Sequence, residues 1–527
     1  MSVPIKTTKE RPDLYIGLVC AAGTDLTELK RQIEAQLVVV GYNYQEIKVS
    51  SLISELLDIS PKPDEYDRIT ELMQGGDSIR QHSTSGDGVA AAIIAEIRRR
   101  RDGDESPSST AYVIDSLKNP AELRLLDRIY GRNYYTISVF RPKDNRIENL
   151  KNKIAHGRHV PPTEEHGDLA QKLIRIDEKG IGKRCQNVQD TFPKADFFVD
   201  GTTDVSSQIK RFVQLVFCEP FITPTTDEFN MFVAKAAALR SCDLSRLVGA
   251  AIVDERFGIV ATGSNEVPYP GGGIFYEGRE DGIGDNRDKE EGHDPNYIEI
   301  HRTLIELIDI LKDTQHVQTS RKADEIAEEL LNGDHKEALK NARIRNLIEF
   351  GRVVHAEMHA ITQAAAAGRA VAGCTLFCTT FPCHGCARHI ISSGIAEVVF
   401  IEPYPKSLTE QLYGGEIEMA NEPLTTEQRS TFKRVRFRPF HGVAPTLYQR
   451  VFAMRDRKDD HGVIAKWLPK KAIPVGAVFG VERPKVETAA SNSVADILER
   501  IRVENTRSKG EIRDGKADTA GADCERS

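Results

Sequence analysis

The sequence lacks any long apolar run. No segment of its 527 residues approaches the roughly 20 consecutive apolar residues that a membrane-spanning helix needs. The opening residues, MSVPIKTTKERPD, also lack the apolar core of a signal peptide. We therefore expect a protein of the cytoplasm that has no membrane partner.

Cysteine is scarce and shows no disulfide pattern. The nine cysteines are odd in number and are spread from Cys20 to Cys524. Only Cys383 and Cys386 have the spacing of metal ligands. We interpret the other seven as buried or incidental thiols.

A basic stripe is missing as well. The formal net charge is −8, whereas a protein that grips a long nucleic-acid backbone usually presents a basic face. The run Arg98–Arg101 is interpreted as a helix end whose charge complements the helix dipole. A local RNA contact at this run is the alternative.

The order of patterns predicts an α/β protein with two domains, because the chain is too long for one core. Alternating apolar β-type runs and helical patterns predict a doubly wound parallel sheet over 1–205. A helix and a proline-bounded break form a hinge at 206–224. A second α/β/α domain is expected over 225–485, with a long insertion at about 271–350, and the polar tail 486–527 is expected to be disordered.

A glycine turn follows the first apolar run, LYIGLVCAA, and precedes a helical pattern. This layout is typical of a phosphate-binding loop and makes Gly17, Gly23, Thr24 and Asp25 candidate nucleotide-binding residues. Asp115, which ends a later strand, stands where a magnesium-holding carboxylate would stand, or serves as a helix cap or turn former. No lysine follows Gly23, and phosphoryl transfer needs one. The first domain is thus predicted to be P-loop nucleotide-kinase-like and regulatory, with a structural relic as the alternative.

An acidic loop opens at Gly271 and runs to about Asn296. Loops of this length inside a domain are usually functional or disordered. We favour a lid, with an unremarkable insertion or a second metal site as alternatives. The candidate ligands of such a second site are Asp281, Asp285, Asp288 and His293.

Two fragments carry the chemistry, HAE at 355–357 and PCHGC at 382–386. The pattern H-x-E…P-C-x-x-C is the one found in zinc deaminases. His355, Cys383 and Cys386 supply three ligands, and the fourth tetrahedral position is left for water, as in catalytic zinc sites. Glu357 lies close enough to act on that water as a general base and general acid without being a ligand.

This pattern has two other interpretations. A structural zinc site would need a fourth Cys or His, for which His359 and His384 are the candidates. His359 also stands one helical turn after His355, as in a metalloprotease motif. That motif needs Glu directly after the first His, and Ala356 occupies the position. Catalytic Zn2+ is therefore the favoured prediction.

The stretch VHAE…CTTFPCHGCARHIISSGI…VVFIEPYPKS resembles the deoxycytidylate deaminase family, together with a hairpin from Val248 to Asn265. This resemblance covers roughly 225–410. With the amino-terminal kinase-like domain and the segments QNVQDTFPKAD, RLVGAAIVD and GSNEVP, most of the chain resembles bacterial anti-phage dCTP deaminases. Those proteins convert dCTP to dUTP and so starve an infecting phage of dCTP. Some are held inactive by a small RNA encoded alongside.

The resemblance implies roles for individual residues. It makes His355, Cys383 and Cys386 zinc ligands and Glu357 the proton shuttle. Asn265 matches the asparagine of the family that contacts the nucleoside. Tyr404 and Lys406 are candidates for contact with the sugar or phosphate, with structural roles as the alternative.

Three hypotheses of function follow. The first is deamination of a free deoxycytidine nucleotide, dCTP or also dCMP, in defence against phage or in nucleotide metabolism. The second is deamination within RNA or single-stranded DNA, against which the acidic balance and the missing basic, aromatic-lined groove argue. The third is a nucleotide- or RNA-sensing module. An inhibitory small RNA, a regulatory nucleotide at the amino-terminal domain and further copies of the chain, in a homo-oligomer, are the other expected partners.

Overall fold

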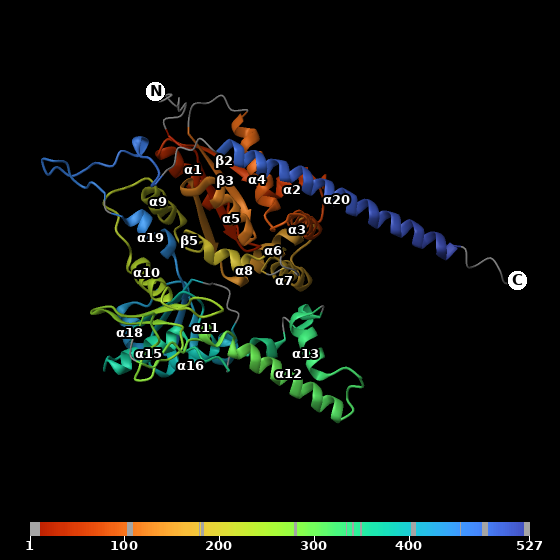
Figure 1. The fold of residues 1–527 in the computed structure, drawn as a ribbon. Coiled ribbons are helices and arrows are strands. Elements are labelled where there is room, and N and C mark those ends of the chain that lie inside the picture. The colour runs from red at the N-terminus through yellow and green to blue at the C-terminus, as the bar shows by residue number, and fades with distance from the viewer. Residues whose placement is uncertain are drawn as a thin grey trace, which may run out of the picture. The chain divides into compact units, whose positions relative to one another are not determined.

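The structure is a computed structural model in which the chain forms two compact units. It describes residues 11–102, 109–178, 180, 184–278, 282–333, 335–339, 342–347, 350–401, 407–453, 455–476 and 483–520. Unit 1 comprises Met1–Glu228 and His441–Ser527, and unit 2 comprises Phe229–Phe440. Each unit is built around a six-stranded, mainly parallel sheet, which confirms the predicted α/β class (Figure 1).

The sheet of unit 1 has the strand order β12-β5-β4-β1-β3-β2. Only its edge pair, β12 with β5, is antiparallel. The central strand is an apolar run that is buried along its whole length, as expected for a parallel sheet covered on both faces. The strands are β1 (Leu14–Cys20), β2 (Asn43–Lys48), β3 (Thr110–Leu117), β4 (Tyr134–Phe140), β5 (Phe197–Asp200) and β12 (Gly442–Val443).

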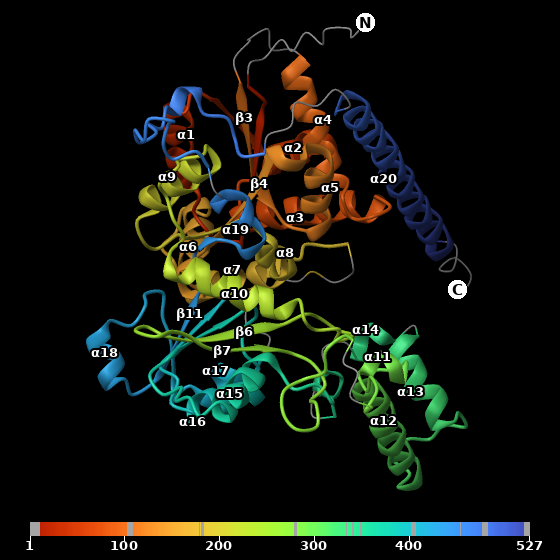
Figure 2. The ribbon, with the colours of Figure 1, turned by 60° about the vertical axis from the view of Figure 1, so that its left-hand side comes forward.

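Helices cover both faces of this sheet (Figures 1 and 2). The apolar sides of α1 and α9 share one core with the strands, and α4 and α5 pack together. Local signals explain where several helices start; at α5, for example, the Asn119 and Glu122 side chains form a reciprocal capping box. The helices are α1 (Thr27–Val39), α2 (Val49–Leu57), α3 (Glu65–His82), α4 (Gly88–Asp102), α5 (Pro120–Tyr130), α6 (Lys143–Gly157), α7 (Glu164–Glu178), α8 (Val188–Thr191), α9 (Val205–Val216), α19 (Pro445–Phe452) and α20 (Arg483–Ala520).

The structure divides the chain differently from the predicted boundaries. Helix α9, placed in a hinge, packs on the unit 1 core through buried residues such as Phe212. The chain returns to unit 1 at His441, where β12 pairs with β5, although 225–485 was assigned to the second domain. The tail expected to be disordered carries α20, whose Ile497 and Ile501 are buried.

The arginine run at the end of α4 is taken up by ion pairs. Arg99 and Arg100 pair with Glu96, and Arg101 forms a two-point pair with Glu487 of α20, with N–O distances of 2.6 and 2.9 Å. These contacts support the interpretation of the run as a helix end.

The sheet of unit 2 has the order β10-β11-β9-β8-β6-β7 and is parallel from β10 to β8. Strands β6 and β7 form an antiparallel hairpin, and β6 also pairs antiparallel with β8. The strands are β6 (Gly249–Asp254), β7 (Gly258–Ser264), β8 (Thr375–Cys378), β9 (Glu397–Phe400), β10 (Ile417–Met419) and β11 (Val435–Pro439).

Two glycines let helices lie directly on the hairpin strands. A Cβ at Gly249 would stand 1.9 Å from the Ala234 carbonyl oxygen of α10 (Thr226–Ala238), and one at Gly263 would stand 1.9 Å from the Ala356 carbonyl oxygen of α15 (Ala356–Ala366). No side chain fits at such distances. The close packing of α15 sets the position of the residues at its start.

The remaining helices of unit 2 include the insertion. A separate small core joins α12 and α13 through residues such as Leu304 and Ala327. The helices are α10 (Thr226–Ala238, which spans the unit boundary), α11 (Asp288–Glu291), α12 (Pro295–Asp313), α13 (Ala323–Asn332), α14 (Lys336–Leu339), α15 (Ala356–Ala366), α16 (His384–Ser392), α17 (Thr409–Tyr413) and α18 (Thr426–Thr431). Within the described ranges, no helix combines the length and apolar character that a membrane span needs.

Candidate metal centre and nucleotide loop

The predicted zinc ligands converge at the starts of two helices. His355 is the residue before α15, and Cys383 is the residue before α16. The His355 Nδ1 atom lies 3.3 Å from the Cys383 Sγ atom and 3.4 Å from the Cys386 Sγ atom. All three ligand atoms lie within 4.8 Å of one another.

These separations fit one zinc ion. Tetrahedral coordination with Zn–N of about 2.0 Å and Zn–S of about 2.3 Å puts nitrogen and sulfur ligands roughly 3.5 Å apart. Among the described residues, this is the one group of three or more His, Cys, Asp or Glu side chains with such geometry. One imidazole and two thiolates form a donor set that zinc prefers.

The charge distribution favours a thiolate at this point. Hydrogen bonds from Cys386 and His355 lower the pKa of Cys383 to about 4. The hydrogen bond between His355 and Cys383 raises the pKa of His355 to about 9. The backbone N–H of Cys386 also donates to the Cys383 sulfur, at 3.4 Å, as expected at a helix start.

Glu357 lies in the first turn of α15 beside the ligands. Its side chain is 3% exposed, and its Oε2 atom accepts a hydrogen bond from the Cys386 thiol at 3.4 Å. Burial, reinforced by the neighbouring Cys383 thiolate, raises the pKa of the Glu357 carboxyl above its ordinary value. A carboxyl in this position has the surroundings of a group that exchanges protons.

The alternative fourth ligands stand elsewhere. His359 is buried and its Nδ1 atom accepts from the Ser264 backbone N–H at 3.1 Å, so its ring is used to hold the end of β7. Neither His359 nor His384 belongs to the described group of metal-ligand atoms.

The hairpin that ends at Asn265 lies beside the metal-ligand residue His355. Glu266 and Val354, the neighbours of Asn265 and His355, form a two-hydrogen-bond bridge. The Asn265 side chain accepts from the Val248 N–H at 2.7 Å and donates to the Arg246 carbonyl at 2.8 Å. Asn265 therefore fixes the local loop, and its contact with a nucleoside stays a prediction. Tyr404 and Lys406 lie outside the described residues.

The acidic loop is organised by an arginine. Arg287 is 3% exposed and pairs with Asp285 and Glu277, with a shortest N–O distance to Glu277 of 2.6 Å. Asp288 pairs with Arg352 at 3.2 Å. These carboxylates thus form ion pairs with arginines. Asp281 lies outside the described residues. The lid stays a prediction.

The predicted nucleotide residues of unit 1 have different roles from one another. Gly17 lies inside β1, where a Cβ would stand 2.6 Å from the Leu117 and Tyr134 side chains, so its small size serves sheet packing. Asp115 pairs with Lys30 at 2.8 Å. The structure therefore assigns neither residue to a phosphate.

Gly23, Thr24 and Asp25 do form a turn between β1 and α1. Gly23 has a φ of +87°, and a Cβ there would stand 2.4 Å from the Arg146 carbonyl oxygen. Asp25, two residues before the first residue of α1, accepts a hydrogen bond from the Thr27 N–H at 2.9 Å. The Thr24 hydroxyl is buried and has no hydrogen-bond partner among the described residues.

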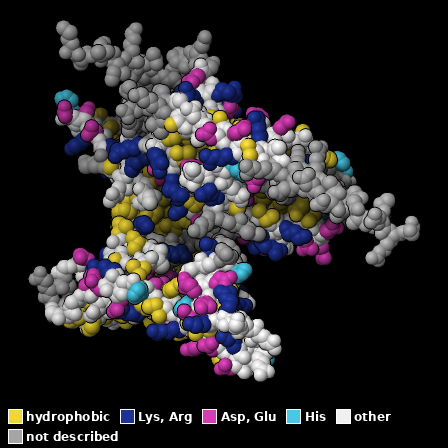
Figure 3. Space-filling model, turned by 45° about the vertical axis from the view of Figure 1, so that its right-hand side comes forward, with side chains coloured by type: hydrophobic (Ala, Val, Ile, Leu, Met, Phe, Trp, Pro, Cys, Tyr) yellow, Lys and Arg dark blue, Asp and Glu magenta, His cyan; other side chains and the backbone are white. Residues whose placement is uncertain are grey.

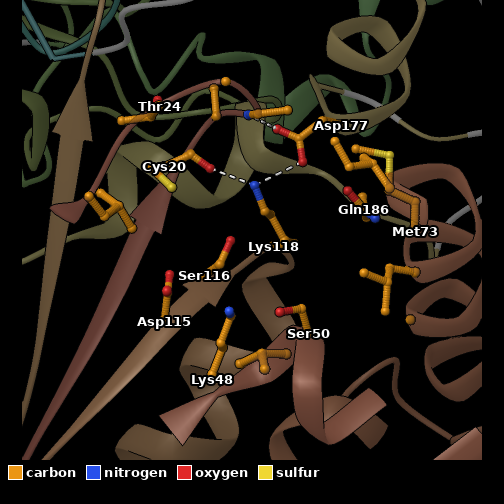
Figure 4. Close-up of a pocket in the computed structure, with 18 of the residues that line it drawn as sticks. Cys20, Thr24, Lys48, Ser50, Met73, Asp115, Ser116, Lys118, Asp177 and Gln186 are labelled. Atoms are coloured by element: carbon orange, nitrogen blue, oxygen red, sulfur yellow. Dashed lines mark hydrogen bonds and ion pairs between the residues drawn. The ribbon is translucent and has the colours of Figure 1, made fainter. Parts of the chain in front are cut away.

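Two side chains that sequence reasoning missed complete this loop. The Asp177 carboxylate, at the end of α7, accepts from the Ala22 backbone N–H at 2.6 Å and pairs with the Lys118 ammonium at 2.9 Å (Figure 4). The Lys118 ammonium also donates to the Cys20 carbonyl at 2.7 Å. Lys118 follows Asp115 by three residues and could have been noticed, whereas no local signal marks Asp177.

Comparison with known proteins bears on the zinc ligands. Residues 224–402 match the model of the cytidine and deoxycytidylate deaminase zinc-binding region. This segment carries a zinc-binding region of the deaminase type. The match includes His355, Glu357, Cys383 and Cys386, so the geometry above and the family pattern agree on Zn2+ as the cofactor.

Individual relatives match shorter parts. The deoxycytidylate deaminase of Enterobacteria phage T2 is 39% identical over 83 residues, which are 15% of this chain and 44% of that protein. The chain therefore spans less than half of that relative.

Solved structures give weaker likenesses. A dCMP deaminase of cyanophage S-TIM5 has a TM-score of 0.19 and 19% identity, over 36% of this chain and 94% of that chain. A gluconokinase of Sinorhizobium meliloti 1021 has a TM-score of 0.20 and 13% identity, over 38% of this chain and 90% of that chain. Likenesses at these scores carry no conclusion about fold or ligands.

Proposed function

We propose that unit 2 is a zinc-dependent deaminase that converts dCTP and water to dUTP and ammonia. The observation that carries this proposal is the convergence of His355, Cys383 and Cys386, with Glu357 buried beside them. The matched zinc-binding region supports the reaction class. The choice of dCTP rests on the resemblance of the fused arrangement to dCTP deaminases.

His355, Cys383 and Cys386 would hold the zinc ion, and the ion would supply Lewis-acid activation that lowers the pKa of water toward about 7. Glu357 accepts a proton from the attacking water and donates it to the ring nitrogen of cytosine. It then takes the second proton to the departing amine. The C4–O bond forms first as water adds to C4, and the bond from C4 to the exocyclic nitrogen then breaks as the second proton reaches that nitrogen, so the products are a uracil nucleotide and ammonia.

A second candidate substrate is dCMP, which the names of the phage relatives favour. Deamination within RNA or single-stranded DNA has less support. The net charge is −8, and on the face drawn in Figure 3 basic side chains are interspersed with acidic ones. Both features weaken binding of a long phosphate backbone.

The test is ammonia release from dCTP, dCMP, cytidine and a cytosine-containing oligonucleotide, with Glu357→Gln as the variant. We expect release from dCTP, lowered about 10²- to 10⁴-fold by Glu357→Gln with the zinc content unchanged. Glu427→Gln, an exposed glutamate of α18, is the matched control and should retain full activity. Release from the oligonucleotide alone would exclude a free nucleotide, and release from dCMP alone would favour the second candidate.

We extend the proposal to the biological role that the resemblance implies. In that role the chain acts as a homo-oligomer, lowers the dCTP pool during phage infection and is held inactive by a small RNA. The dCTP pool of infected cells should fall with the wild-type chain and stay constant with Glu357→Gln. An equal fall with both chains would contradict the defence role.

A further inference from the structure

Unit 1 contains a pocket that the deaminase reaction does not use. The pocket has a volume of about 370 Å³ and lies at the ends of β1 and β3 (Figure 4). Loop 20–27, the start of α2, and side chains of α3, α6 and α7 bound it. Its size falls in the range of about 300–1,000 Å³ that holds small organic molecules.

The place that a phosphate would take on loop 20–27 is occupied by a carboxylate of the protein itself. In phosphate-binding loops, backbone N–H groups and a lysine hold a phosphate. Here the Ala22 N–H and Lys118 hold the Asp177 carboxylate, which is fully buried. Asp25 similarly occupies the start of α1. A phosphate therefore does not lie on the loop in this arrangement, and phosphoryl transfer from it is not expected.

Two lysines that line the pocket, Lys48 and Lys153, have no ion pair among the described residues and are left for a ligand. Most of the basic groups that line the pocket are neutralised by carboxylates: Lys30 by Asp115 and Glu46, Lys118 by Asp177, Arg80 by Glu122 and Asp77, and Arg68 by Glu65. The Lys48 ammonium points into the pocket near the hydroxyls of Ser50 and Ser116 (Figure 4). A lysine beside two hydroxyls suits a phosphate group.

A buried amide lies deeper in the same pocket. Gln186 is 5% exposed, and its Oε1 atom has no hydrogen-bond partner among the described residues. A buried acceptor without a partner destabilises the folded chain, and a ligand that donates an N–H would remove that cost. The apolar residues of the lining include Ile53, Ile69, Leu72, Met73 and Leu150.

We propose that this pocket binds a nucleoside phosphate and does not transfer its phosphoryl group. The phosphate is held by Lys48, Ser50 and Ser116. The base packs on the apolar wall and donates an N–H to the Gln186 amide. This inference is independent of the deaminase proposal, since none of the pocket's residues belongs to unit 2.

The experiment is calorimetric titration of the full zinc-loaded chain with AMP, ATP, GMP, dTMP, ribose 5-phosphate and inorganic phosphate. The variants are Lys48→Glu and Gln186→Leu. Lys210→Glu, on the exposed side of α9, is the matched control for charge. Both positions are tested because Gln186 is buried and its variant could fail to fold, whereas Lys48 is exposed.

We expect at least one nucleotide to bind in the micromolar range. Lys48→Glu should weaken that binding about tenfold or more, because a charge-assisted contact is replaced by repulsion. Gln186→Leu should weaken the binding of nucleotides about tenfold and leave the binding of ribose 5-phosphate unchanged. Lys210→Glu should change the binding of neither.

Several results would overturn the proposal. These are the absence of binding by every nucleotide, binding that both variants leave unchanged, and ribose 5-phosphate or inorganic phosphate that binds as tightly as any nucleotide. Release of phosphate from ATP that Lys48→Glu abolishes would overturn the statement that no phosphoryl group is transferred.

Discussion

The metal centre of unit 2 and the loop of unit 1 both place polar groups at the starts of helices. They differ in whether a side chain of the protein occupies the position between those groups. At the metal centre three side chains converge, and no fourth ligand of the chain joins them among the described residues. At the loop, the chain supplies the anion itself through Asp177. A binding motif therefore predicts an external ligand only where no side chain of the protein already fills the ligand's position.

The largest expected effect comes from removing one metal ligand. Cys386→Ala should reduce bound zinc to under about a tenth of an ion per chain and lower ammonia release about a thousandfold or more, because two ligands do not hold the ion in place. Cys374→Ala removes another buried thiol of the same unit that lies outside the ligand group and should retain zinc. Metal analysis and ammonia release measure both, and zinc retained by Cys386→Ala would refute the ligand set.

The internal anion of unit 1 should matter for stability and not for zinc. Asp177→Asn leaves the Lys118 ammonium without its charged partner, and we expect a loss of about 3–5 kcal/mol in the free energy of unfolding. The double variant Asp177→Asn, Lys118→Met should lose less than the sum of the single variants. Urea unfolding of the full chain tests this. If the variant unfolded like wild type, Asp177 would not be an integral part of the loop.

A smaller effect is expected at the glycine of the loop. Gly23→Ala adds a Cβ that meets the Arg146 carbonyl oxygen at 2.4 Å on a backbone with φ of +87°. We expect a loss of about 2–3 kcal/mol in unfolding free energy. Gly86→Ala is the matched control, since φ there is +80° but the nearest atom stands at 3.5 Å, and about 1 kcal/mol is expected. Equal losses at the two glycines would show that the close approach to Arg146 is unimportant.

The smallest effect depends on pH and concerns Asp196, a carboxylate of unit 1 that forms no ion pair with a lysine among the described residues. Burial raises the pKa of Asp196 to about 6, and the Thr136 N–H donates to it at 2.9 Å. Because the folded pKa lies above the unfolded value of about 3.9, this group lowers stability as pH rises toward 6. Asp196→Asn should stabilise the chain by about 1–2 kcal/mol at pH 8 and by less at pH 5. Unfolding at both values measures the difference, and a gain that is the same at both would contradict this account.

The sequence predicted the parts of the molecule that carry strong local patterns. The alternation of apolar strands and helices identified the α/β class, and the spacing of His355, Cys383 and Cys386 identified the metal centre. The hairpin before Asn265 was predicted as well, and Glu266 and Val354 bring it beside the ligands. Each of these signals lies within a few residues or follows a fixed periodicity.

Other features depend on contacts between distant residues. The return of the chain to unit 1 depends on β12, which has two residues and no readable period. The loop at Ala22 is occupied by the carboxylate of Asp177, which stands 155 residues further along the chain. The tail helix α20 is mostly polar, and its packing depends on a few residues such as Glu487 and Ile497. Nothing in their local sequence distinguishes these residues from solvent-exposed ones.

The most direct test of the account is ammonia release from dCTP while zinc is returned to metal-free chain. We predict that activity rises in proportion to bound zinc, saturates at one ion per chain and is not restored in Cys386→Ala. Full activity in the metal-free chain, or activity restored equally in Cys386→Ala, would contradict it.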